Sequence, residues 1–165
     1  MMKSFDTYAD LLEWIEQKGY TPRVLGQAPD GAPIVSIKIG GEKGPAIFIS
    51  AGSHATEQAG VSAATALIEQ LETEHPVYIL PCRDPIGLNG FSYALSLSIA
   101  NLPPLNTIDD VNTVLKKHGE ILYEKDDTLL VIIGEYGYAN KGLYGQFEKG
   151  QPFLKSLIGR RIFFP

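Results

Sequence analysis

The predicted fold depends on one stretch of the sequence, Ala46-Ile47-Phe48-Ile49-Ser50-Ala51-Gly52-Ser53-His54-Ala55-Thr56-Glu57. An apolar run ends at Gly52, and His54 and Glu57 follow it three residues apart. A helical pattern continues downstream, which predicts that the pair lies on the loop between a buried strand and a helix. An imidazole and a carboxylate at this spacing can point the same way, as two ligands of one zinc ion must.

The residues around this loop predict a parallel strand–helix–strand unit. Residues 46–51 are apolar nearly throughout, which is typical of a strand covered on both faces, and residues 77–80 form a second such run. Between them, residues 57–71 predict a helix whose buried stripe consists of Ala59, Ala63, Ala66, Leu67 and Leu71. Ligands of parallel sheets lie beyond the carboxyl ends of the strands, so we expect the His54 loop and residues 81–85 to border one crevice.

The remaining elements surround this unit. Two helices are expected at 7–18 and 107–118, each with a capping-box-like start and a glycine stop. An antiparallel hairpin is expected over 23–39 and a third buried strand over 129–133. The weaker expectations are short helices at 91–99 and 152–157, a long aromatic- and glycine-rich loop at 134–150, and a final apolar stretch at 162–164.

Together these elements predict an α/β fold with a mostly parallel, mixed sheet flanked by helices and an antiparallel hairpin at one edge. We expect residues 1–165 to form a single α/β domain.

The composition narrows the class of protein. The chain has 165 residues, of which 44% are hydrophobic and 20% charged, and its formal net charge is −5. A mildly acidic chain without a basic cluster argues against nucleic acid as the main partner. No apolar run approaches the roughly 20 residues that span a bilayer, so no membrane partner is expected. The single cysteine excludes an internal disulfide, and with no secretory segment at the amino terminus we expect a cytoplasmic location.

The His-x-x-Glu pair is a weak motif by itself. The structural interpretation is that His54 is a loop residue and that Glu57 is an acid in the first turn of a helix, where the helix dipole favours it. The position of the pair, at the carboxyl end of a predicted parallel strand, favours metal binding. Gly52 supports this interpretation because it allows close approach of the backbone.

Several separate pieces of the chain, taken in order, resemble the opening of a zinc metallocarboxypeptidase of the carboxypeptidase A type. That family reads Gly-x-Ser-x-x-Gly-Arg-Pro-Ile, then a strand, then Gly-x-His-Ala-Arg-Glu. The similarity covers roughly residues 5–90, and Ala32 and Thr56 stand where the family carries arginines. Residues 84–87 read Asp-Pro-Ile-Gly near the family's Asn-Pro-Asp-Gly. The corresponding pieces here are Arg23-Val24-Leu25-Gly26, Asp30-Gly31-Ala32-Pro33-Ile34 and Ser50 to Glu57.

This resemblance implies a zinc-dependent hydrolase that removes C-terminal amino acids from peptides, with His54 and Glu57 as the first two zinc ligands. It also implies a later histidine ligand, an Asn-Arg pair that grips the substrate carboxylate, and a late glutamate as general base. None of these is found, so the chain is interpreted as the amino-terminal part of such a catalytic domain. We expect it to bind zinc weakly and to be inactive alone, and its catalytic residues are unknown.

Other residues have a functional and a structural interpretation. Arg83 is a candidate for binding a substrate carboxylate. Its structural interpretation is a salt bridge to Asp84 or to a neighbouring acid. His118 is better explained as a helix-end residue than as a ligand. The Asn140-Lys pair is not assigned the Asn-Arg role, because lysine lacks the bidentate fork. Cys82 is most simply a buried small hydrophobe, and its pairing with His54 in catalysis needs hydrogen-bond reach.

Two other functions remain open at this point. An amide hydrolase of the aspartoacylase and succinylglutamate desuccinylase type shares the Gly-x-His-x-x-Glu start and acts on small acyl-amino acids. A non-catalytic binding module that keeps the fold without a complete site is the alternative from another class. The Asp-Gly turn at 30–31 and the Pro-Ile pair at 33–34 favour the carboxypeptidase type.

Overall fold

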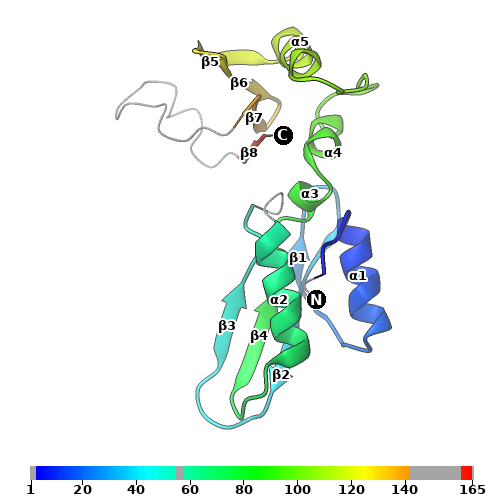
Figure 1. Cartoon of the computed structure of the whole chain (residues 1–165), viewed down its shortest axis with the longest axis vertical. Helices are drawn as coiled ribbons and strands as arrows, with labels where there is room; N and C mark the ends of the chain where they lie inside the picture. Colours follow the sequence, from blue (N-terminus) through cyan, green and yellow to red (C-terminus); the bar gives the residue numbers. More distant parts are fainter. Residues whose placement is uncertain (1–2, 55–57, 142–160, 165) are drawn as a thin grey trace. The chain divides into compact units, whose positions relative to one another are not determined.

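The computed structural model describes residues 3–54, 58–141 and 161–164 (Figure 1). The chain divides into two compact units, Met1–Gly90 and Phe91–Pro165. Each unit is built of helices and one small mixed sheet of four strands, so the α/β class is confirmed. The single domain over residues 1–165 stays a prediction. No helix in the described ranges is long and apolar enough to cross a membrane.

The first unit contains the predicted strand–helix–strand arrangement. Strands β3 and β4 are parallel neighbours joined by α2, while β1 pairs with β2 and β2 with β4 in antiparallel fashion. The sheet order is therefore β1-β2-β4-β3, and the predicted hairpin at one edge is confirmed. The elements are α1 (Tyr8–Gln17), β1 (Arg23–Gln27), β2 (Pro33–Gly40), β3 (Ile47–Ser50), α2 (Gln58–Gln70), β4 (Pro76–Leu80) and α3 (Pro85–Leu88).

Helix α1 begins where the sequence predicts because its cap is complete. The Thr7 hydroxyl accepts a hydrogen bond from the Asp10 amide at 3.2 Å, and the Asp10 carboxylate accepts one from the Thr7 amide at 2.9 Å. This reciprocal capping box satisfies two backbone donors that a helix start otherwise leaves open.

The core of the first unit lies between the two long helices and one face of the sheet. Ile37 of β2 stands opposite Ile79 of β4 in the register, and both are fully buried. Trp14 is also buried, and its ring meets that of Phe5 edge to face at 5.9 Å. Burial of a large apolar side chain of this kind stabilises the folded state by about 1.5–3 kcal/mol relative to its exposure to water. The cluster comprises Phe5, Tyr8, Leu11, Trp14, Ile15, Val35, Ile37, Val61, Ala64, Ile68, Val77, Ile79, Cys82 and Leu88.

The predicted buried stripe of α2 is wrong for three of its five residues, whereas Leu71 packs against the core. The face that packs on the sheet carries Val61, Ser62, Ala64, Thr65 and Ile68, whereas Ala59, Ala63 and Leu67 are exposed. Two polar residues can lie on the buried face because their hydroxyls are bonded: Ser62 Oγ donates to the Lys3 carbonyl at 2.7 Å, and Thr65 Oγ1 donates to the helix backbone.

Strand β3 is not covered on both faces, contrary to the prediction. It is the edge strand of its sheet, and the side chains of Ile47 and Phe48 are 44% and 60% exposed. The apolar run therefore predicts the strand correctly but not its neighbours, because hydrophobicity does not reveal where a sheet ends.

The second unit is a separate small α/β unit with sheet order β5-β6-β7-β8. In the described part of the chain, only β3/β4 and β7/β8 are parallel, and the other pairings of both sheets are antiparallel. The prediction of a mostly parallel sheet is therefore wrong. The elements are α4 (Phe91–Ser96), α5 (Ile108–His118), β5 (Glu120–Lys125), β6 (Thr128–Ile133), β7 (Tyr136–Ala139) and β8 (Ile162–Phe163).

Strand β6 pairs with β5 and β7 in antiparallel fashion, and neither of these two neighbours is predicted from the sequence. Asp126 and Asp127 both have positive φ, 49° and 60°, and form a tight turn that folds β5 back onto β6. Residues 136–139, predicted as loop, are strand β7, and the rest of that loop beyond residue 141 lies outside the described residues, as does the helix predicted at 152–157. The aromatic side chain of Tyr138 is fully buried and stacks on Phe163 with ring centroids 5.7 Å apart.

We predict that Tyr8→Phe destabilises the first unit by about 1 kcal/mol near neutral pH, because the Tyr8 hydroxyl donates to the Pro33 carbonyl at 2.6 Å. Burial first, and then the neighbouring Cys82, raises the pKa of the Tyr8 phenol above its ordinary value. The folded state thus holds this proton more tightly than the unfolded chain, whose phenol titrates near pH 10. This contribution is complete below that pH and is lost as the pH rises further.

The measurement is urea unfolding followed by the fluorescence of Trp14, the only tryptophan of the chain. Between about pH 9 and 11 the free energy of unfolding should fall more steeply in the wild type than in Tyr8→Phe. Parallel curves for the two proteins would contradict the account of Tyr8.

Candidate metal and substrate site

The candidate site lies beyond the carboxyl ends of β3 and β4. There the two backbone segments that follow these strands remain hydrogen-bonded to each other. The Ala51 amide donates to the Leu80 carbonyl, the Arg83 amide to the Ala51 carbonyl, and the Asp84 amide to the Gly52 carbonyl, each at 2.9 Å. These bonds hold the start of the His54 loop beside residues 81–84. The predicted meeting of the two segments at one sheet edge is confirmed.

Gly52 makes this close approach possible. Its φ is +60°, and a Cβ atom added to it would lie 2.9 Å from the Cys82 Cα and 3.1 Å from the Val61 Cγ2. A side chain is therefore excluded both by the backbone conformation and by the neighbouring atoms. Helix α2 also comes close here, since a Cβ on Gly60 would lie 3.5 Å from the Gly52 nitrogen.

Asp84 holds the segment of residues 81–84 in place by capping the helix that follows it. It is 5% exposed, and its Oδ1 accepts a hydrogen bond from the Gly87 amide at 2.8 Å, so that it caps the short helix α3. The residues of α3 are buried, which anchors the segment to the core of the first unit. The carboxylate of Asp84 is therefore a structural group that supports the loop.

Arg83 is exposed between these buried neighbours. Among the described residues no ion pair includes Arg83, so the salt bridge considered from the sequence is not observed there. Its backbone adjoins the segment that leads into the turn with His54, since the Arg83 amide bonds to the Ala51 carbonyl. A guanidinium group can bind a carboxylate through two parallel hydrogen bonds.

His54 lies in the turn that follows Gly52, and its side chain is exposed. Glu57 lies outside the described residues, so the predicted pair remains a prediction. An imidazole nitrogen and a carboxylate oxygen are both good donors for zinc. Within the described ranges, however, no group of three or more His, Cys, Asp or Glu side chains is placed to hold a metal ion.

The other candidates have structural roles. Cys82 is fully buried and belongs to the core, as expected for a small hydrophobe. His118 is exposed in the last turn of α5. Asn140 is 4% exposed and joins three elements: its Oδ1 accepts from the Leu129 amide, and its Nδ2 donates to Asn112 Oδ1 and to the Asp127 carbonyl. Nothing in the sequence indicates this role beyond the position of Asn140 directly after an apolar run.

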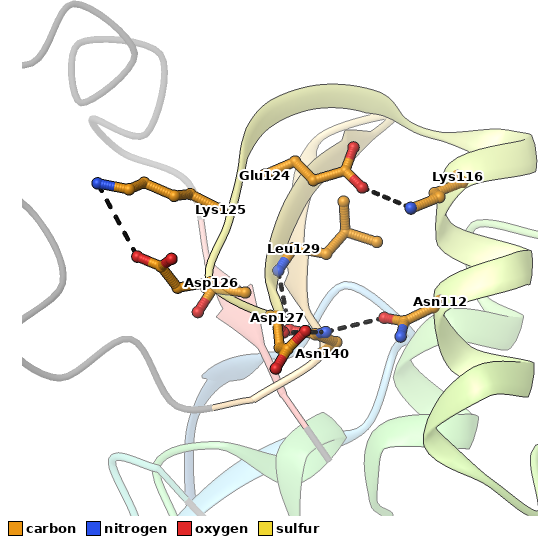
Figure 2. A pocket seen from close by; sticks show the side chains of 9 residues that line it. Asn112, Lys116, Glu124, Lys125, Asp126, Asp127, Leu129 and Asn140 are labelled. Carbon is orange, nitrogen blue, oxygen red and sulfur yellow. Dashed lines mark hydrogen bonds and ion pairs between the residues drawn. The ribbon is translucent and has the colours of Figure 1, made fainter.

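Asn140 also lines a hollow of about 280 Å³ in the second unit (Figure 2). The side chains of Asn140 and Asn112 point toward one another, and the ion pair between Lys116 and Glu124 connects α5 with β5 at another side. The buried amide of Asn140 makes its hydrogen bonds within the protein. The hollow is lined by Asn112, Lys116, Glu124, Lys125, Asp126, Asp127, Thr128, Leu129 and Asn140.

No protein-family profile and no curated protein matches the chain. Solved structures match in part. Bovine thrombin-activatable fibrinolysis inhibitor, bound to a tick carboxypeptidase inhibitor, has a TM-score of 0.44 and 16% identity, over 53% of this chain and 33% of that one. A second structure of thrombin-activatable fibrinolysis inhibitor has a TM-score of 0.41 and 18% identity, over 50% and 26%.

A protein from Shewanella amazonensis whose name describes it as a metallopeptidase has a TM-score of 0.39 and 28% identity, over 50% of this chain and 33% of that one. The chain therefore spans between about a quarter and a third of the length of these structures.

We predict that Gly52→Ala destabilises the first unit by about 2 kcal/mol or more, because the added methyl group meets the Cys82 backbone in a strained conformation. Gly26→Ala is the matched control, since a Cβ at Gly26 would have no atom within 4 Å. It should change the free energy of unfolding by no more than about 0.5 kcal/mol. Urea unfolding followed by Trp14 fluorescence measures both, and equal effects would contradict the close approach at Gly52.

Proposed function

We propose that the chain carries the amino-terminal part of the site of a zinc-dependent hydrolase of the metallocarboxypeptidase type. The observation that supports this most is the paired backbone beyond β3 and β4, with His54 and Arg83 both exposed on adjoining segments. The resemblance of residues 50–57 and of the preceding hairpin to the family pattern supports the same proposal.

In this proposal His54 and Glu57 hold the zinc ion, with imidazole nitrogen and carboxylate oxygen as donors. Zinc held there would supply Lewis-acid chemistry, that is, polarisation of the scissile carbonyl and a lowered pKa of a coordinated water. The chain's own contribution is to fix the histidine loop through Gly52 and to present Arg83 to the substrate. Because catalytic zinc normally uses three protein ligands, two ligands alone should give weak binding and no hydrolysis.

The proposed substrate is a peptide with a free C-terminal carboxylate, which is the group that Arg83 would bind. An N-acyl amino acid, the substrate class of the aspartoacylase type, also carries a carboxylate. The two classes differ in length, since a peptide continues through further residues on the amino-terminal side of the scissile bond and an N-acyl amino acid ends there in its acyl group. Comparing the binding of a peptide with that of an N-acyl amino acid therefore distinguishes the carboxypeptidase type from the aspartoacylase type.

We predict that zinc binding, measured by calorimetry, weakens by about tenfold or more in the double variant His54→Ala, Glu57→Ala. His118→Ala is the matched control, because His118 is an exposed histidine remote from this loop in the sequence, and it should leave the affinity unchanged. Zinc binding that persists undiminished in the double variant would overturn the ligand assignment.

We further predict that a short peptide with a free C-terminal carboxylate binds in the presence of zinc and that amidation of its C-terminus weakens binding about tenfold. Arg83→Ala should abolish the difference between the two peptides, whereas Arg23→Ala, at another exposed arginine, should preserve it. Chemical-shift titration provides the measurement. If the wild type binds both peptides equally well, Arg83 does not bind the carboxylate.

A further inference from the structure

The loop that contains His54 runs from the end of β3 to the start of α2, which begins at Gln58. Its first residues are held by the backbone bonds of Ala51 and Gly52 to the segment that follows β4. The first turn of α2 packs against the same place, because a Cβ on Gly60 would lie 3.5 Å from the Gly52 nitrogen. The position of this turn therefore affects both ends of the loop.

The side chain of Gln58 clamps the backbone of Phe5. Its Oε1 accepts a hydrogen bond from the Phe5 amide at 3.1 Å, and its Nε2 donates one to the Phe5 carbonyl at 2.7 Å. A side-chain amide carries both an acceptor and donors, so it can pair with the two polar backbone groups of one residue. Phe5 lies in no helix or strand, and Gln58 supplies the partners that secondary structure provides elsewhere.

A second bond, one helical turn further on, joins the same two segments. Ser62 follows Gln58 by four residues, and its Oγ donates to the Lys3 carbonyl at 2.7 Å. Residues four apart lie on the same face of a helix, so both side chains reach the amino-terminal segment together. Residues 3–5 thus form an amino-terminal strap along the first turn of α2.

The strap is itself anchored in the core of the first unit. The Phe5 ring is 2% exposed and meets the ring of Trp14 edge to face at 5.9 Å. Trp14 belongs to α1, whose start is fixed by a complete capping box. A continuous series of contacts therefore leads from α1 through the strap to the first turn of α2 and on to Gly52.

We propose that Gln58 is a positioning residue for the loop that contains His54, and that the strap acts on this loop through Gln58. The N–H groups of a first helical turn have no partners within the helix, and helix ends fray. Loss of the clamp would let this turn fray and release its packing on Gly52. The inference rests on the proposed function, which gives the loop its metal-binding role, and Gln58 itself touches neither metal nor substrate.

Amide hydrogen exchange tests the positioning without any metal. In Gln58→Ala the Phe5 amide should lose its protection. Protection of the Asp84 amide, which donates to the Gly52 carbonyl, should fall about fivefold. The Gly41 amide, bonded at the other end of the sheet, reports general destabilisation and should change by less than about twofold.

Two further variants separate the hydrogen bonds from other effects of the substitution. Gln58→Met has a side chain of similar length without the amide and should behave like Gln58→Ala, because the lost hydrogen bonds are responsible. Gln70→Ala makes the same substitution at the exposed last residue of α2 and is the matched control. It should leave the protection of the Phe5 and Asp84 amides at the wild-type level.

Zinc calorimetry tests the consequence for the proposed function. Gln58→Ala and Gln58→Met should weaken zinc binding about fivefold while Trp14 fluorescence shows that the protein stays folded, and Gln70→Ala should not weaken it. A purely structural strap would lower protection at Phe5 but leave the Asp84 amide and the zinc affinity unchanged, and this result would overturn the proposal.

Failure of the proposed function gives a different result. Zinc binding that persists undiminished in His54→Ala would show that the loop does not hold the metal. The exchange of the Asp84 amide would still decide whether Gln58 positions the loop. Equal protection of this amide in the wild type and in both Gln58 variants overturns the positioning role, whatever the zinc affinity.

Discussion

The parallel pairing of β3 with β4, continued by backbone hydrogen bonds past the ends of both strands, is the constraint on which the candidate site depends. The bonds from Arg83 to Ala51 and from Asp84 to Gly52 bring two segments together that are some thirty positions apart in the sequence. They form only because residue 52 has no side chain. The chemistry proposed for His54 and Arg83 is therefore a consequence of close backbone packing.

Much of the first unit could be predicted because its signals are local. The capping box of Thr7 and Asp10, the Asp30-Gly31 turn and the apolar runs of β3 and β4 each determine structure within a few residues. Short-range chemistry of this kind does not depend on which element packs against which. The same reason explains the correct prediction of α5 and of β6 in the second unit.

Features that depend on neighbours were not predictable. Both faces of α2 contain small or apolar residues, and only the position of the sheet selects Val61 and Ile68 over Leu67. The apolar β3 has the composition of a central strand although it lies at an edge. In the second unit the turn between β5 and β6 depends on the positive φ of Asp126 and Asp127, which aspartate allows but does not require. At the site, the sequence predicts His54 and its loop, whereas the exposure of Arg83 required the structure.

Zinc K-edge X-ray absorption on the metal-loaded protein tests whether His54 binds the metal. If His54 and Glu57 bind zinc, we expect a first shell of nitrogen and oxygen atoms at about 2.0–2.2 Å with an imidazole signature that is lost in His54→Ala. A sulfur shell at about 2.3 Å would place the metal on Cys82, the only thiol of the chain, and would contradict the account. A shell unchanged by His54→Ala would contradict it equally.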